Sequence, residues 1–145
     1  MNAQYRHFHT SAATAAATPA ASWAASRYRT ADLEARVAAA DPHELVSMLL
    51  TGLRDALGKA ERALTSAART PAAGRALAII EALDTSLDFS AGGSVARALN
   101  RVYAQVRMLV VAGNLEIRPE LFAAAAAQIA AVHASWRAIR PSSRA

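Results

Sequence analysis

Hydrophobic residues recur at three- and four-residue steps in four separate stretches of the chain, which is the spacing of one face of an α-helix. The first stretch follows "ADP" at residues 40–42 and predicts a helix from Pro42 to about Ala67. Its apolar stripe consists of Val46, Leu49, Leu50, Leu53, Leu57, Ala60 and Leu64. A single stripe of this kind indicates a helix that packs one face against a core.

The other three stretches show the same period. We expect their helices to span Pro71 to about Leu87, Ser94 to about Gly113, and Pro119 to about Ile139. The second stripe contains Ala76, Leu77, Ile80, Leu83 and Leu87, and the third contains Val95, Leu99, Val102, Val106, Leu109 and Val110. The fourth contains Leu121, Phe122, Ala125, Ile129, Val132, Trp136 and Ile139.

Capping and turn residues set the expected ends of these helices. Asp41 can accept from unpaired N–H groups of the first turn, Pro42 suits the first helical position, and Glu44 can reach back to the cap. The remaining boundary signals are Thr70-Pro71, Gly92-Gly93, Gly113-Asn114 and Pro141.

Four long amphipathic helices joined by short loops predict an all-α protein, packed as an antiparallel up-down four-helix bundle. A short extra N-terminal helix is expected at "TADLEARVAAA", with Thr30 as its N-cap. Residues 1–29 contain no acidic residue and no apolar period, which predicts a disordered tail, although this composition also fits a transit peptide. The expected organisation is a tail at 1–29, a helical domain at 30–140 and a C-terminal tail at 141–145.

Composition narrows the class of protein further. The chain has no cysteine, so a disulfide framework and a thiolate metal site are excluded. No apolar run reaches the roughly 18 residues that cross a bilayer, so we expect no membrane insertion. The net charge of +5, carried by 15 Arg and one Lys, leaves a nucleic-acid-binding basic helical protein as the alternative. Against it, the arginines are scattered and aromatic residues do not interleave with them.

Reactive side chains show no catalytic or metal-binding pattern. The four histidines have no H-x-x-x-H or H-E-x-x-H spacing, and no Glu-x-x-His motif of a di-metal bundle occurs. Asp84 and Asp88 lie four residues apart, but a solvated face or a turn explains them better than an acid pair. We therefore expect no enzyme activity, no metal and no cofactor.

A few large apolar residues fall away from the core stripes. On the third helix, Met108 lies about 160° and Val111 about 140° from the centre of the stripe, at about 100° per residue. Leu77 and Ile79 lie on opposite edges of the second stripe, and Met48 falls off the first. Such residues on adjoining helices can line a groove for a partner helix. We predict that Leu77, Ile79, Met108 and Val111 line this groove.

The segments "ADPHELVSMLLTGLRDAL" and "LDFSAGGSVARALNRVY" resemble the signatures of the FliS family, the export chaperones of flagellin. "ADPHELVSMLLTGLRDAL" resembles the family's first-helix signature at Ala40, Pro42, Glu44, Leu45, Met48, Leu49 and Gly52. "LDFSAGGSVARALNRVY" resembles a second signature at Leu87, Asp88, Gly92, Gly93, Ala96, Leu99 and Tyr103. Ala112, Asn114 and Trp136 are similar to later family positions, so the resemblance runs from about residue 37 to 140.

The chain departs from the family pattern at several positions. Leu50 stands where the family has a tyrosine, Thr51 where an acid follows it, and Ala98 where the second signature has asparagine. The segment "AQV" at 104–106 replaces an acid-Tyr-Met sequence. Tyr28 is the nearest candidate for the family's tyrosine upstream of the first helix, although it lies several residues farther from Pro42.

The resemblance implies a cytoplasmic antiparallel bundle that binds the disordered C-terminal segment of flagellin. In such proteins the segment wraps over the bundle as short helices, which prevents premature polymerisation and aids export. An N-terminal segment can cover part of the groove, and Tyr28 is the candidate residue for this cap. Other flagellar export components are further candidate partners.

Overall fold

The computed structural model describes residues 31–35 and 41–139. Throughout these ranges the regular structure is helical, which confirms the predicted all-α class. The chain divides into two units between Asp41 and Pro42. Residues 31–35 are helical, as expected for part of the extra N-terminal helix. The Thr30 cap and the tails predicted at 1–29 and 141–145 fall outside the described residues.

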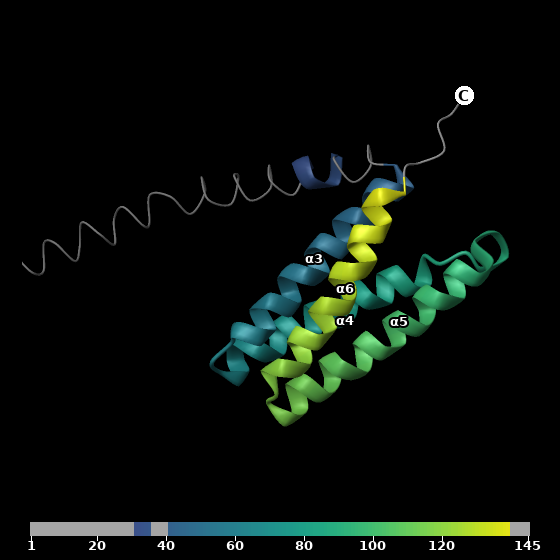
Figure 1. Ribbon diagram of the computed structural model, residues 1–145. Helices are drawn as coiled ribbons and strands as arrows, with labels where there is room; N and C mark the ends of the chain where they lie inside the picture. Colours follow the sequence, from purple (N-terminus) through teal and green to yellow (C-terminus); the bar gives the residue numbers. More distant parts are fainter. Residues whose placement is uncertain (1–30, 36–40, 140–145) are drawn as a thin grey trace, which may run out of the picture. The chain divides into compact units, whose positions relative to one another are not determined.

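Four long helices follow in the second unit (Figure 1): α3 (Pro42–Arg62), α4 (Ser66–Thr85), α5 (Phe89–Glu116) and α6 (Pro119–Ala138). Each packs against two others, because α3 contacts α4, α4 contacts α5, α5 contacts α6 and α6 returns to α3. These four contacts close a ring around one core, as an up-down four-helix bundle requires.

Side-chain contacts show that neighbouring helices run antiparallel. Between α4 and α5, the early residue Thr70 donates to the late residue Asn114, while the late residue Asp84 accepts from the early residue Asn100. Between α3 and α6, Ser47 near one helix start meets His133 near the other helix end. The predicted up-down topology is therefore confirmed.

The core is built from the predicted stripes. The largest fully buried side chains, with less than 2% of their surface exposed, are Phe122, Leu50, Leu53, Leu57, Ile80, Leu83, Ile129, Val106 and Val110. Tyr103 joins them at 2%. Burying a large apolar side chain contributes about 1.5–3 kcal/mol, so this shared interior is the main term that stabilises the bundle.

The boundary between α3 and α4 differs from the prediction. The first helix ends at Arg62 rather than near Ala67, and the second begins at Ser66 rather than at Pro71. Thr65 is the N-cap, and its hydroxyl accepts from the N–H of Ala68 at 3.2 Å. Leu64, which the sequence placed on the first stripe, is 97% exposed, so no burial favours extending α3 past it.

The end of α5 also differs from the prediction. The helix passes through Gly113 and Asn114 and continues to Glu116. Its C-cap is Ile117, at φ 55° and ψ 55°, a left-handed conformation that is uncommon outside glycine. The N–H groups of Ile117 and Arg118 both donate to the carbonyl of Gly113, which closes the helix in the manner of a Schellman turn.

The start of α5 contains the predicted glycine break. Asp88 caps a first turn by accepting from the N–H groups of Ser90 and Ala91 at 3.0 and 3.1 Å. Gly93 then takes φ 50° and ψ −120°, outside the helical range, before the regular helix continues from Ser94. These hydrogen bonds lower the pKa of Asp88, that from the Ser90 hydroxyl most. Asp88 is therefore a capping residue.

A reciprocal contact joins the start of α3 to the end of α6. The Nε2 of His43 donates to the carbonyl of Trp136 at 2.9 Å, and the indole Nε1 of Trp136 donates to the carbonyl of His43 at 2.9 Å. The two rings stack with centroids 4.8 Å apart and planes inclined by 12°. This clamp fixes segments 93 residues apart in the sequence.

Candidate functional site

The four groove residues predicted from the sequence lie on two different parts of the bundle. Met108 and Val111 point outward from α5, where 72% and 40% of their surfaces are exposed. Leu77 and Ile79 on α4 are both half-buried against the core. Ile79 lies on the α3 side, since its Cδ1 is 3.4 Å from the position that a Cβ on Gly52 would take. Tyr28 falls outside the described residues.

Polar contacts fix the seam between α4 and α5. At one end, Asn114 Oδ1 accepts from Arg69 Nε and from the Thr70 hydroxyl, each at 3.3 Å. At the other end, Arg107 lies 3.4 Å from Glu81 and 3.8 Å from Asp84. These two sets of polar contacts bound a stretch of the α4/α5 seam, and the positions of the predicted groove residues can be compared with it.

Leu77 and Val111 both fall on that stretch. Leu77 lies between the two sets of polar contacts along α4, and Val111 lies between them along α5. Met108 is on the adjoining outer turn of α5. The fold therefore brings Leu77, Met108 and Val111 to one side of the bundle and leaves Ile79 on the other edge of α4.

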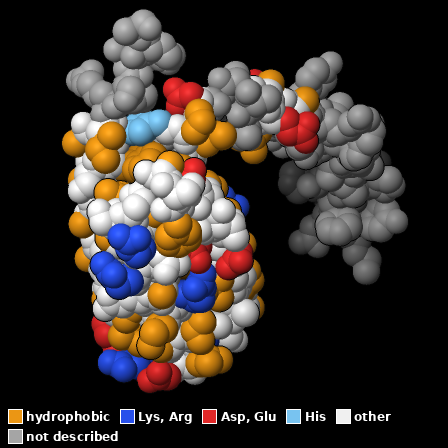
Figure 2. All heavy atoms as spheres, turned by 90° about the vertical axis from the view of Figure 1, so that its right-hand side faces the viewer, with side chains coloured by type: hydrophobic (Ala, Val, Ile, Leu, Met, Phe, Trp, Pro, Cys, Tyr) orange, Lys and Arg blue, Asp and Glu red, His pale blue; other side chains and the backbone are white. Residues whose placement is uncertain are grey.

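Leu115 extends this apolar surface and was not predicted. It lies two turns after Met108 on the same face of α5 and is 76% exposed. The seven-residue spacing from Met108 was the available signal. Gly113-Asn114 predicts a helix end, however, and a helix that ends there leaves Leu115 in a loop. Figure 2 shows this side of the bundle, where hydrophobic side chains gather toward the lower end.

A separate apolar pocket of about 330 Å³ opens at the end of the bundle where α3 begins and α6 ends. Its apolar lining includes Val46, Leu87, Leu99, Tyr103 and Trp136. Burial, with a smaller contribution from the nearby Asp84, raises the pKa of Tyr103 to about 12. The phenol therefore stays neutral at physiological pH, and the pocket suits an apolar side chain.

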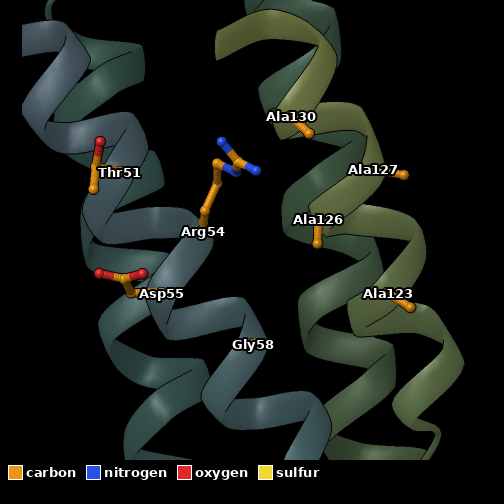
Figure 3. Close-up of a pocket in the computed structure, with 8 residues that line it drawn as sticks. All are labelled: Thr51, Arg54, Asp55, Gly58, Ala123, Ala126, Ala127 and Ala130. Carbon is orange, nitrogen blue, oxygen red and sulfur yellow. The ribbon is translucent and has the colours of Figure 1, made fainter. Parts of the chain in front are cut away.

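A shallow groove of about 500 Å³ runs between α3 and α6 (Figure 3). Four alanines line it from α6, and Arg54 extends across it from α3 toward α6. The guanidinium Nη1 of Arg54 lies 3.3 Å from Nδ1 of His133, which is 4% exposed. Burial lowers the pKa of His133, and the nearby cations Arg54 and Arg137 lower it further.

The described residues hold no cluster of three or more His, Asp or Glu side chains that could bind a metal ion. Within residues 31–35 and 41–139, no helix has both the length and the hydropathy that a transmembrane span requires.

Comparison with known proteins identifies the family of the chain. The family model described as flagellar protein FliS matches residues 24–143, which includes the whole bundle. The chain belongs to the FliS family. The match begins before the first described residue, so the FliS pattern also covers the segment that contains Tyr28.

Two relatives place the chain at moderate distance within the FliS family. It is 29% identical over 119 residues to the flagellar secretion chaperone FliSB of Pseudomonas aeruginosa, covering 80% of this chain and 94% of the relative. It is 25% identical over 117 residues to the flagellar secretion chaperone FliS of Vibrio cholerae, covering 79% and 86%. The aligned lengths span nearly the whole of each relative, as expected for FliS proteins of similar size.

Proposed function

We propose that this protein is a cytoplasmic flagellar secretion chaperone that binds the C-terminal segment of flagellin along α5 and the α4 edge beside it. The observation that supports this most directly is the row of exposed apolar side chains at Met108, Val111 and Leu115. The interior of the bundle is filled by its own buried side chains, so a client would bind on the outer surface. Membership of the FliS family and the names of the two relatives support the chaperone role.

Binding of this kind is coupled to folding of the client. A disordered segment must bury enough apolar area to offset the entropy lost when it becomes ordered. Met108 and Leu115 together offer a surface that a client helix can cover, and Leu77 and Val111 deepen it at the seam. Mass action then keeps the segment from polymerising without any chemical step.

The two remaining predicted residues have separate places in the proposal. Ile79 faces α3 and would contact a client that wraps around α4 to the neighbouring face. Tyr28 belongs to the N-terminal segment and is the proposed cap of the unoccupied surface. The assignment of Ile79 rests on helix geometry, and that of Tyr28 rests on the FliS resemblance.

The direct test is a titration of the full-length chain with a fluorescent peptide of the flagellin C-terminal segment encoded in the same genome. We expect micromolar or tighter binding by wild type. Met108→Asp should weaken it by about tenfold or more, because the client would have to desolvate a carboxylate. The readout is fluorescence anisotropy across a concentration series.

A matched control is Leu64→Asp, which places the same charge at an apolar residue that is 97% exposed and lies between α3 and α4. It should bind as wild type does. Failure of wild type to bind at micromolar concentration would contradict the proposed function. Equal binding by Met108→Asp and Leu64→Asp would contradict the placement of the surface on α5.

A further inference from the structure

The outer face of α5 changes character along its length. Eight exposed residues of the regular helix from Ser94 on share this face within about 60° of Met108, at about 100° per residue. We name them the α5 outer stripe: Ser94, Arg97, Arg101, Ala104, Gln105, Met108, Val111 and Leu115. The N-terminal part carries two arginines one turn apart, and the C-terminal part carries three large apolar side chains. Arg101 and Met108 are separated by about 10 Å along the helix axis.

The two arginines of the stripe have no partner in the described part of the chain. Some other arginines of the bundle do: Arg107 pairs with Glu81, and Arg118 pairs with Glu116 and Glu120. Arg97 and Arg101 make no hydrogen bond or ion pair there. The positions three and four residues away on α5 carry no Asp or Glu, so the helix itself cannot neutralise them.

The composition of the stripe selects among anionic partners. A nucleic acid is bound by many cations that follow its phosphates. On this face of α5, two arginines are followed along the helix by three large apolar side chains. Figure 2 shows Lys and Arg side chains above the apolar gathering on this side of the bundle. A partner that matches both parts must carry carboxylates and apolar side chains on one surface, as an amphipathic helix does.

We propose that the α5 outer stripe recognises one acidic amphipathic helix of the client, with two carboxylates one turn apart facing Arg97 and Arg101. The apolar residues of that helix lie about two to five turns away and cover Met108, Val111 and Leu115. This inference rests on the proposed function and specifies which part of the client lies on α5, and in which register.

The physical reason is the cost of covering the arginines. A client helix that buries Met108 and Leu115 extends over Arg101 and Arg97 and removes water from them. Guanidinium groups covered without a partner cost free energy, whereas carboxylates opposite them form charge-assisted hydrogen bonds. Charge thus fixes the position of the client helix, and apolar contact supplies most of the affinity.

The test compares two double charge reversals of equal net charge in the full-length chain. One is Arg97→Glu with Arg101→Glu on the stripe. The matched control is Lys59→Glu with Arg62→Glu, two exposed cations in the last turn of α3. Binding of the flagellin C-terminal peptide is measured at about 50 and about 500 mM NaCl, where surface ion pairs are weakly and strongly screened. Thermal melting checks that both variants fold.

We expect the stripe reversal to weaken binding by about tenfold at low salt, from two ion pairs of roughly 0.5–1 kcal/mol each. Its affinity should also depend less on salt than that of the control. A peptide with its acidic residues changed to lysine should bind the stripe variant better than it binds wild type. Such a rescue shows a direct contact, because a general change of net charge would affect the control equally.

Equal binding by the two double variants, with equal salt dependence, would overturn the acidic-helix inference. The proposed function would survive that result if wild type binds the peptide and Met108→Asp does not. Absence of wild-type binding would contradict the proposed function and this inference together. Loss of binding only in the stripe variant, reversed by the lysine peptide, supports both.

Discussion

His133 is a buried histidine whose hydrogen bonds identify its neutral form. Arg54 can only donate, so Nδ1 of His133 is the acceptor at 3.3 Å. Nε2 therefore carries the proton and donates to the hydroxyl of Ser47 at 3.3 Å. The charged groups that act on this ring are Arg54 from α3 and Arg137 from α6, and both are cations. Protonation would place a third positive charge in a buried position and remove the bond to Arg54.

This arrangement predicts that the bundle loses stability in mild acid. Burial, then Arg54 and Arg137, lower the pKa of His133 below its usual 6.5, so the unfolded chain takes up the proton more readily than the folded one. The free energy of unfolding should fall as pH drops through about 6.5 toward the lower folded pKa. Urea unfolding at a series of pH values from 8 to 5.5 measures this.

The matched variant is His133→Gln, which cannot titrate. Because it also removes side-chain contacts, the informative quantity is the slope of stability against pH and not its absolute value. The slope should be smaller in the variant than in wild type, because the variant lacks the proton uptake of His133 on unfolding. Identical slopes would show that His133 does not cause the acid sensitivity.

Leu50 is the clearest departure from the FliS signature, and its position explains what the departure affects. The side chain is fully buried in the core between the stripes of α3 and its neighbours. A residue in that place contributes to packing and cannot contact a client on the outer surface. The change from the family's tyrosine therefore bears on how the core is filled, and the candidate surface on α5 is unaffected by it.

At the scale of single elements, the junction of α5 and α6 depends on a glycine that the sequence suggested for another role. A Cβ on Gly113 would lie 3.2 Å from Cζ and 3.3 Å from Cε1 and Cε2 of Phe122. Gly113 is buried and inside the helix, so its small size, and not its backbone freedom, is what the fold uses. The ring of Phe122 fills the space that this glycine leaves.

Gly113→Ala should therefore destabilise the protein, although alanine is the better helix former. The fully buried Phe122 cannot move away without disturbing the core, and overpacking of this kind costs about 1–3 kcal/mol. That cost exceeds the gain in helix propensity of up to about 1 kcal/mol. Urea or thermal unfolding of the variant measures the sum of the two effects.

Gly74→Ala is the matched control on α4. A Cβ at Gly74 would meet nothing within 4 Å, and the residue is exposed. Only the propensity effect remains there, so this variant should be more stable than wild type by about 0.5–1 kcal/mol. If both variants changed stability in the same direction, the packing role of Gly113 would be wrong.

At the scale of the whole molecule, the positive charge is unevenly distributed. The chain has a net charge of +5, but residues 41–139 contain ten Lys or Arg and nine Asp or Glu. The bundle is thus close to neutral, and the excess of arginine lies mainly in residues 1–30 and 140–145. A nearly neutral bundle provides no continuous cationic surface for phosphates.

We therefore expect only weak, sequence-independent DNA binding by the full-length chain. A duplex of about 20 base pairs should bind at low salt and lose most of its affinity by about 150 mM NaCl. Electrophoretic or anisotropy titrations at several salt concentrations test this. Tight binding at 150 mM NaCl would instead favour the alternative of a nucleic-acid-binding helical protein.

The periodic apolar pattern was sufficient to predict four helices, their order and most of the large side chains of the core, although Val95 and Ile139 from the predicted stripes are exposed and the buried Tyr103 lay on none of them. Helix period and capping are local properties, so Asp41-Pro42 and Pro119 predicted helix starts where the structure has them. Short connections then made an antiparallel ring the economical packing. The FliS signatures could be recognised because they are residue types at fixed local spacing, such as Pro42, Glu44 and Met48.

Other features depended on which residues meet across the bundle. In the sequence, Gly113-Asn114 predicts a helix end. In the fold, Asn114 lies inside the helix and accepts hydrogen bonds from Arg69 and Thr70, 45 and 44 residues earlier. The burial of His133 and the small size required of Gly113 likewise come from neighbours on other helices. Leu77 and Ile79 share a stripe in the sequence, yet they face different helices in the bundle. Such contacts depend on the register and rotation of packed helices, which the period of a single helix does not contain.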